Sequence, residues 1–132
     1  MSGGTESPSA PPADLATPLL RLEGVAALGA GILLWGQVNG NWLLFVPLLL
    51  VPDLSMVGYL RGPATGAAVY NAFHNWALTG AILGLGWGLG QPIVIGAGAV
   101  LLAHIGADRL LGYGLKYPTS FQDTHLGRIG RR

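Results

Sequence analysis

The chain has 132 residues, of which 51% are hydrophobic and only 10% are charged, and its mean hydropathy is +0.50. A soluble domain of this length cannot hide so much apolar surface in its own core, so the composition indicates insertion into a membrane. The absence of cysteine excludes disulfides, thiolate metal sites and cysteine nucleophiles. The net charge of +1 does not distinguish between classes of protein.

The chain is expected to begin with a polar tail followed by a membrane span. Residues 1–18 are rich in Ser, Gly, Pro and Ala and contain no apolar run, which predicts a disordered tail. The first span is expected over residues 19–38 and includes Arg21 and Glu23 near its inner end. Residues 24–38 alone are too short to cross a hydrocarbon core of about 30 Å.

Two further spans follow along the chain. A turn containing Gly and Asn leads to the second span, residues 42–60, in which Pro47 and Pro52 free backbone carbonyls and favour kinks. The Arg-Gly-Pro sequence at 61–63 ends this span, and the third is expected over residues 64–88.

The last span is expected over residues 93–115, and residues 116–132 form a polar C-terminal tail. The predicted fold is therefore all-α, a bundle of four transmembrane helices. All seven Lys and Arg residues fall on one side of this bundle, which predicts that both termini are cytoplasmic. They are Arg21, Arg61, Arg109, Lys116, Arg128, Arg131 and Arg132.

Ionisable residues inside these apolar spans are the main indication of function, because a charge within the bilayer is costly unless it is paired or used. With a rise of about 1.5 Å per helical residue, Asp53, His74, His104 and Asp108 fall at a similar depth in the inner half of the bundle. Glu23 lies shallower on the first helix. We therefore expect the spans to contribute polar side chains to one layer.

Carboxylates and imidazoles in one layer form an oxygen and nitrogen ligand set suited to zinc, manganese or iron. The tail adds an Asp-x-His pair, which either folds back over the inner mouth or stays solvated. The predicted metal ligands are Glu23, Asp53, His74, His104, Asp108, Asp123 and His125. Tyr113 and Lys116 are the predicted catalytic residues, which would stabilise developing negative charge.

Two sets of small residues recur at every fourth position, a pattern that lets membrane helices approach closely. They are Gly80, Gly84 and Gly88 in the third span and Ala99, Ala103 and Ala107 in the fourth. We expect both sets at helix–helix contacts.

Several motifs resemble those of a known family. They are PDLSMVGY at 52–59, YNAFH at 70–74, AHIGADR at 103–109, GYGLKYP at 112–118 and DTHLG at 123–127. Over about residues 21–128 the chain resembles the small bacterial membrane proteins grouped as domain of unknown function 4260. The resemblance implies a multi-pass protein of the bacterial cytoplasmic membrane and no particular activity.

Three functions are compatible with the sequence. The favoured one is a metal-dependent membrane enzyme, of hydrolase or oxidase type, that acts on an amphiphilic substrate from the inner leaflet. The second is a proton-linked carrier, because Asp and His chains also relay protons, and the third is a structural or partner-binding subunit. The expected partners are the lipid bilayer and a lipid-like substrate rather than nucleic acid, and the four spans are compatible with a homodimer.

Overall fold

The computed structural model describes residues 16–129, which form five α-helices, one 3₁₀-helix and a pair of two-residue strands. The predicted all-α class is confirmed. Residues 1–15, which make up most of the predicted N-terminal tail, lie outside the described residues, as do residues 130–132 with Arg131 and Arg132.

Three helical segments in the described chain are long and apolar enough to cross a membrane. They are Thr17–Gln37, Trp42–Arg61 and Pro92–Leu111, with mean hydropathies of 1.5, 1.9 and 1.6. These segments correspond to the first, second and fourth predicted spans. The first and last are single helices, α1 (Ala16–Gln37) and α5 (Pro92–Leu111).

The second segment changes helix type at its prolines. Helix α2 (Trp42–Leu49) continues after Leu50 as the 3₁₀-helix η1 (Val51–Arg61). Pro52 has no N–H to donate, and the N–H of Asp53 donates to the Leu50 carbonyl at 3.1 Å, one residue closer than in an α-helix. The carbonyl of Leu49 is thereby left free for another donor.

Helix η1 has three distinct faces, because a 3₁₀-helix has three residues per turn. Every third residue from Val51 to Leu60 is exposed, and the next face turns Ser55 and Gly58 inward, where both are buried. The remaining face carries Asp53 and, two turns further on, the half-buried ring of Tyr59.

The third predicted span, residues 64–88, is not one continuous helix. Helix α3 (Pro63–Phe73) ends at His74, and Asn75 begins α4 (Trp76–Leu89). The Asn75 side chain accepts the Leu78 N–H at 2.9 Å and donates to the last carbonyls of α3, so both helix ends are satisfied without a Pro or Gly. This arrangement places His74 between the two helices.

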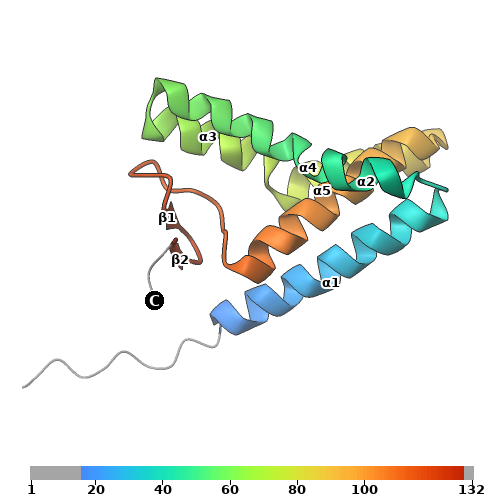
Figure 1. Ribbon diagram of the computed structural model, residues 1–132, viewed down its shortest axis with the longest axis horizontal. Coiled ribbons are helices and arrows are strands. Elements are labelled where there is room, and N and C mark those ends of the chain that lie inside the picture. Colours follow the sequence, from blue (N-terminus) through green and yellow to red (C-terminus); the bar gives the residue numbers. More distant parts are fainter. Residues whose placement is uncertain (1–15, 130–132) are drawn as a thin grey trace, which may run out of the picture.

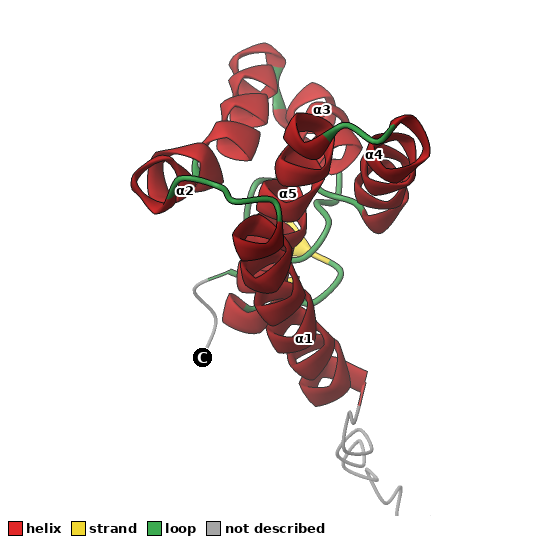
Figure 2. Cartoon of the chain, turned by 90° about the vertical axis from the view of Figure 1, so that its right-hand side faces the viewer, coloured by secondary structure: helices red, strands yellow, loops and turns green. Residues whose placement is uncertain are grey.

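Helix α5 is the centre of the packing. It lies against α1 along much of its length and against α4 on another side, while α3 pairs with η1 (Figure 1). Figure 2 shows α1, α2 and α4 arranged around α5. Helices α1 and α5 approach most closely where Gly24 meets Gly106 and Gly31 meets Ala103, since side chains at the glycines would contact the opposite backbone.

The small-residue prediction is correct for the fourth span and wrong for the third. Ala99 and Ala103 are fully buried in the core. Gly80, Gly84 and Gly88 instead lie on an exposed face of α4, where an added Cβ would meet no described atom within 4 Å. Helix α4 packs on α5 through a different side, on which Leu83 and Gly86 are buried.

The chain after α5 folds back against α3 rather than leaving the helices. Strands β1 (Asp123–Thr124) and β2 (Gly127–Arg128) pair antiparallel, and Lys116 bridges to Thr124. This segment lies between the end of α5 and the α3 helix (Figure 1). The Phe121 ring packs edge-on against Tyr59 of η1 with 5.4 Å between centroids.

Replacing glycine by alanine should change the protein's stability in opposite directions at Gly84 and Gly106, because only Gly106 lies at the tight contact between α1 and α5. Gly84→Ala should stabilise the protein by up to about 1 kcal/mol through helix propensity alone. Gly106→Ala should lower the free energy of unfolding by about 1–3 kcal/mol, because its methyl group meets the α1 backbone. Reversible unfolding in detergent measures both, and equal stability of the two variants would contradict the packing.

Candidate metal centre

Four side chains converge where η1, the α3–α4 break and α5 meet. Asp53 comes from the first turn of η1, His74 from the break, and His104 and Asp108 from successive turns of α5. One nitrogen or oxygen atom of each lies within 4.8 Å of the corresponding atom of every other. We call these four residues the His/Asp cluster.

His74 is held in a single orientation. It is completely buried, and its Nδ1–H donates to the Tyr70 carbonyl at 2.8 Å. That carbonyl is available because the His74 N–H bonds to Asn71 instead, at the end of α3. The Tyr70 ring stacks on the imidazole with 3.7 Å between centroids, and Ser55 Oγ lies 3.4 Å from Nδ1. The Nε2 atom therefore faces the cluster.

His104 is oriented by the same device on another helix. It is 6% exposed, and its Nδ1–H donates to the Leu49 carbonyl, which the change from α2 to η1 leaves free. In both rings the acceptor is a main-chain carbonyl, so the hydrogen resides on Nδ1 and the Nε2 lone pair is available. The two Nε2 atoms are 3.1 Å apart.

The carboxylates complete the cluster around these two nitrogens. Asp53 Oδ1 lies 3.1 Å from His104 Nε2 and 3.4 Å from His74 Nε2. Asp108 Oδ2 lies 3.2 Å and 3.8 Å from the same two atoms, and it accepts the Tyr70 hydroxyl at 3.2 Å. Four electron-rich atoms at these separations repel one another unless a proton or a metal cation lies among them.

Arg109 stabilises the helix break beside the cluster, a role that the sequence analysis did not identify. The residue is 4% exposed, and its guanidinium donates to the His74 carbonyl at 3.2 Å and to the Tyr113 carbonyl at 3.0 Å. It also lies over the Trp76 ring at 5.7 Å. A buried arginine in the last turn of a helix signals such a contact with main-chain carbonyls.

A cavity of about 240 Å³ adjoins the cluster at its two carboxylates. Its lining includes the cluster residues Asp53 and Asp108 and both predicted catalytic residues, Tyr113 and Lys116. Phe121 closes it from the C-terminal segment. The structure therefore brings the two predicted catalytic residues to the same cavity as the two carboxylates.

Lys116 is buried at the edge of this cavity, at 4% exposure. The Asn71 side chain fixes its backbone, accepting the Lys116 N–H at 2.6 Å and donating to its carbonyl at 2.8 Å. The ammonium lies over the rings of Phe121 and Tyr70, at 3.9 and 4.9 Å. Burial lowers the pKa of Lys116 to about 8, and the carboxylates of Asp108 and Asp53 oppose this by favouring the charged form.

Three of the predicted metal ligands do not join the cluster. Glu23 is exposed on α1, because the neighbouring Gly24 occupies the face toward α5. Asp123 accepts the Thr119 hydroxyl at 2.5 Å. His125 Nδ1 accepts the Leu115 N–H at 2.7 Å, and the His125 N–H donates to the Leu115 carbonyl at 3.0 Å. The last two side chains thus hold the C-terminal segment together.

The fold and the cluster define a class: a helical protein with three helices of membrane-spanning length and a buried His/Asp group able to hold a metal ion. The chain matches the family described as Domain of unknown function (DUF4260) over residues 17–129, and it belongs to this family. No curated protein and no solved structure was found to match it. The expected family is confirmed, and it assigns no activity.

The contacts of Arg109 predict that this residue is needed for stability. Arg109→Met leaves two carbonyls without their donor and should lower the free energy of unfolding by about 1–3 kcal/mol. Arg61→Met removes an exposed arginine and should change it by less than about 0.5 kcal/mol. Unfolding curves in detergent compare the two, and equal losses would contradict the assigned role.

The hydrogen bond between the Leu115 N–H and His125 should depend on pH. Partial burial and then the charge of Arg109 lower the pKa of His125, so the folded segment favours the neutral ring, whose Nδ1 accepts the Leu115 N–H. The contact is complete above the ordinary pKa of about 6.5 and is lost as the pH falls. Hydrogen exchange of the Leu115 amide, corrected for its intrinsic rate, should accelerate on acidification.

His125→Asn is the matched variant for this measurement. The amide oxygen can replace Nδ1 as the acceptor and does not titrate in this range. Exchange at Leu115 should therefore lose most of its pH dependence in His125→Asn. An unchanged dependence in that variant would assign the effect to another group.

Proposed function

We propose that the chain is a multi-pass protein of the bacterial cytoplasmic membrane whose His/Asp cluster binds one divalent zinc, manganese or iron ion. It acts as a metal-dependent enzyme, of hydrolase or oxidase type, on an amphiphilic substrate that enters from the inner leaflet. The observation that carries the proposal is the pair of imidazole Nε2 atoms, 3.1 Å apart, facing each other and two carboxylates.

The nitrogen–nitrogen and nitrogen–oxygen separations within the cluster bracket those expected around one ion. Ligands at about 2.0–2.2 Å from a tetrahedral metal are roughly 3.3–3.6 Å from one another. The nitrogen–nitrogen and nitrogen–oxygen distances range from 3.1 to 3.8 Å. Both imidazoles also have the carbonyl partners on Nδ1 that orient histidine ligands in metalloproteins.

Exposed apolar surface supports the membrane assignment. Only 17% and 11% of the two spans nearest the N-terminus are buried within the protein, so most of their apolar side chains face outward. The turns at 38–41 and 90–91 lie at one end of the helices (Figure 1), opposite the turn between η1 and α3 and the C-terminal segment. With the basic residues in the cytoplasm, both termini are inside.

The third span of this topology, residues 64–88, is the broken pair α3 and α4. Non-helical backbone within a bilayer is tolerated where it is buried in protein, and broken helices often carry ion sites. The break at His74 and Asn75 meets this condition, because Asn75 caps α4 and Arg109 binds the His74 carbonyl. The interruption is thus compatible with a membrane span that supplies a ligand.

The cavity beside the cluster supports an enzyme rather than a purely structural site. A divalent ion held by the His/Asp cluster would supply Lewis acidity toward an oxygen of the substrate. The Lys116 ammonium lies in the same cavity and stabilises negative charge that develops during the reaction. Tyr113, which lines the opening, orients the substrate head by hydrogen bonding.

Metal content of protein purified in mild detergent, without a His-tag or chelator, tests the proposal. We expect near-stoichiometric zinc, manganese or iron in the unmodified chain. Asp108→Asn and His104→Asn should reduce the bound metal by at least about tenfold, because each removes a ligand. Glu23→Gln and His125→Asn change the same residue classes outside the cluster and should retain the metal.

Folding of every variant is checked by circular dichroism and by gel filtration. A folded, metal-free protein would overturn the proposed metal centre and favour a proton-linked carrier or a structural polar cluster. Equal metal in Asp108→Asn and Glu23→Gln would place the ion elsewhere. Ion flux in vesicles then separates the carrier from the structural role.

A further inference from the structure

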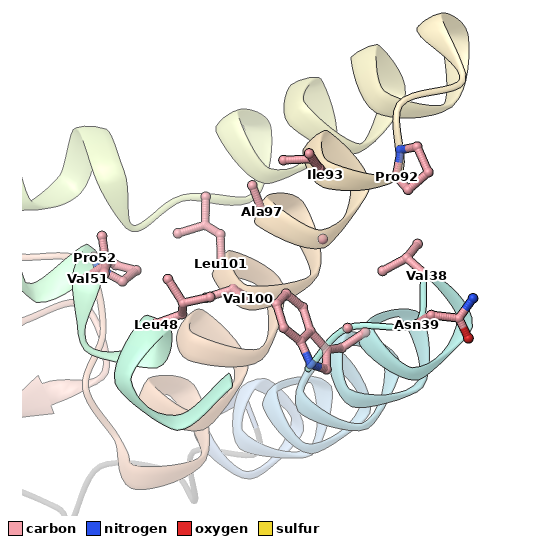
Figure 3. Close-up of a pocket in the computed structure, with 13 residues that line it drawn as sticks. Val38, Asn39, Leu48, Val51, Pro52, Pro92, Ile93, Ala97, Val100 and Leu101 are labelled. Atoms are coloured by element: carbon pink, nitrogen blue, oxygen red, sulfur yellow. The ribbon is translucent and has the colours of Figure 1, made fainter. Parts of the chain in front are cut away.

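An apolar groove of about 490 Å³ lies between α5, α2 and the end of α1 (Figure 3). Val38 follows α1, Leu48 belongs to α2, and Val100 belongs to α5, and these residues line it from three sides. Trp35 forms part of the same wall. The polar side-chain groups of the lining are the Asn39 amide, at the far end from the cluster, and the buried indole N–H of Trp35.

A second apolar cavity of about 400 Å³ adjoins this groove. The two share Val51, Pro52 and Leu101 as lining residues, so they meet at the start of η1. Pro52 directly precedes the cluster residue Asp53. The second cavity also reaches Ser55, whose hydroxyl lies 3.4 Å from His74 Nδ1. The apolar path therefore ends at Pro52 and Ser55, which adjoin Asp53 along η1 and His74 on its Nδ1 side.

The groove and the cluster lie on one face of α5. The lining residues of this helix form two adjacent rows at four-residue intervals, Pro92, Gly96 and Val100 in one and Ile93, Ala97 and Leu101 in the other. The next positions on that face are His104 and Asp108. The groove extends about 14 Å along the helix, from Pro92 to Leu101. His104 follows Leu101 by less than one turn, so the cluster begins on this face directly after the groove ends.

We propose that the groove holds the linear aliphatic chain of an amphiphilic substrate, with its polar head at the His/Asp cluster and its methyl end toward the turns at 38–41 and 90–91. This inference rests on the proposed function and specifies its substrate class. The small residues Gly96 and Ala97 leave room for a chain along α5, and the mostly apolar lining offers it dispersion contacts.

The orientation follows from the polarity of the two ends. A carboxylate or phosphate head has a cationic partner at the cluster end, the divalent ion proposed there. At the other end the lining consists of apolar residues and Asn39. A chain in the reverse direction would bury its head among apolar side chains and leave its methyl end beside four ionisable groups, which is unfavourable.

Quenching of Trp35 fluorescence by brominated fatty acids tests both occupancy and direction. Trp35 lies beside Gly96, about 12 Å along α5 from His104. A variant that retains Trp35 alone, with Trp42→Phe, Trp76→Phe and Trp87→Phe, is titrated in lipid nanodiscs. We expect saturable quenching that is stronger with bromines near the methyl end than with bromines near the carboxylate.

Ala97→Phe fills the groove and Ala81→Phe is its matched control. Both alanines are exposed in helices, but Ala81 lies on α4 and lines none of these cavities. Ala97→Phe should raise the fatty-acid concentration for half-maximal quenching by about tenfold or more, and Ala81→Phe by less than about twofold. If the Trp35-only chain does not fold, the same comparison in the unmodified chain replaces it.

Metal content measured on the same samples separates the two proposals. Ala97→Phe should keep its metal while losing saturable quenching. Quenching that rises linearly with fatty acid and is equal in both variants indicates bulk lipid and overturns the groove assignment. Stronger quenching by bromines near the carboxylate overturns the orientation. A metal-free protein with saturable quenching leaves the chain site standing and removes the metal centre.

Discussion

The site depends on two hydrogen bonds from imidazole Nδ1 atoms to main-chain carbonyls. His74 donates to Tyr70 and His104 donates to Leu49, and each carbonyl is free because a helix changes or ends at that point. Buried donors and acceptors are costly when unpaired. Each carbonyl that a helix change or helix end frees is therefore paired with an imidazole Nδ1–H, and each Nδ1–H depends on that free carbonyl. The bonds fix both Nε2 lone pairs toward Asp53 and Asp108.

Helix lengths and spacing could be predicted from the sequence because they follow from composition and from a fixed rise per residue. The depth of Asp53, His74, His104 and Asp108 was deduced in this way, and the structure brings these four side chains together. Depth alone does not give the direction in which a side chain points around its helix. The prediction of Glu23 as a metal ligand, from a shallower position on the first helix, is therefore wrong, because the packing of Gly24 on α5 turns it outward.

The break between α3 and α4 was missed because no Pro or Gly marks it. The available signal was Asn75 before the apolar run of α4, a residue type that commonly caps helices. Arg109 illustrates a second limit, since its partner His74 is distant in sequence and offers a carbonyl rather than a side chain. The Asp-x-His pair of the tail was assigned to metal binding, but both residues make local contacts that a sequence pattern does not distinguish.

The 3₁₀ geometry of η1 couples the cluster mechanically to the C-terminal segment. With three residues per turn, Asp53 and Met56 both face the polar cavity, and Tyr59, next on that face, reaches Phe121. In an α-helix the same six-residue interval would rotate Tyr59 by about 120° away from Asp53 and shorten the eleven-residue η1 by roughly 5 Å. If η1 rewound into an α-helix, Tyr59 would turn away from Phe121, and the contact that holds Phe121 at the cavity would be lost.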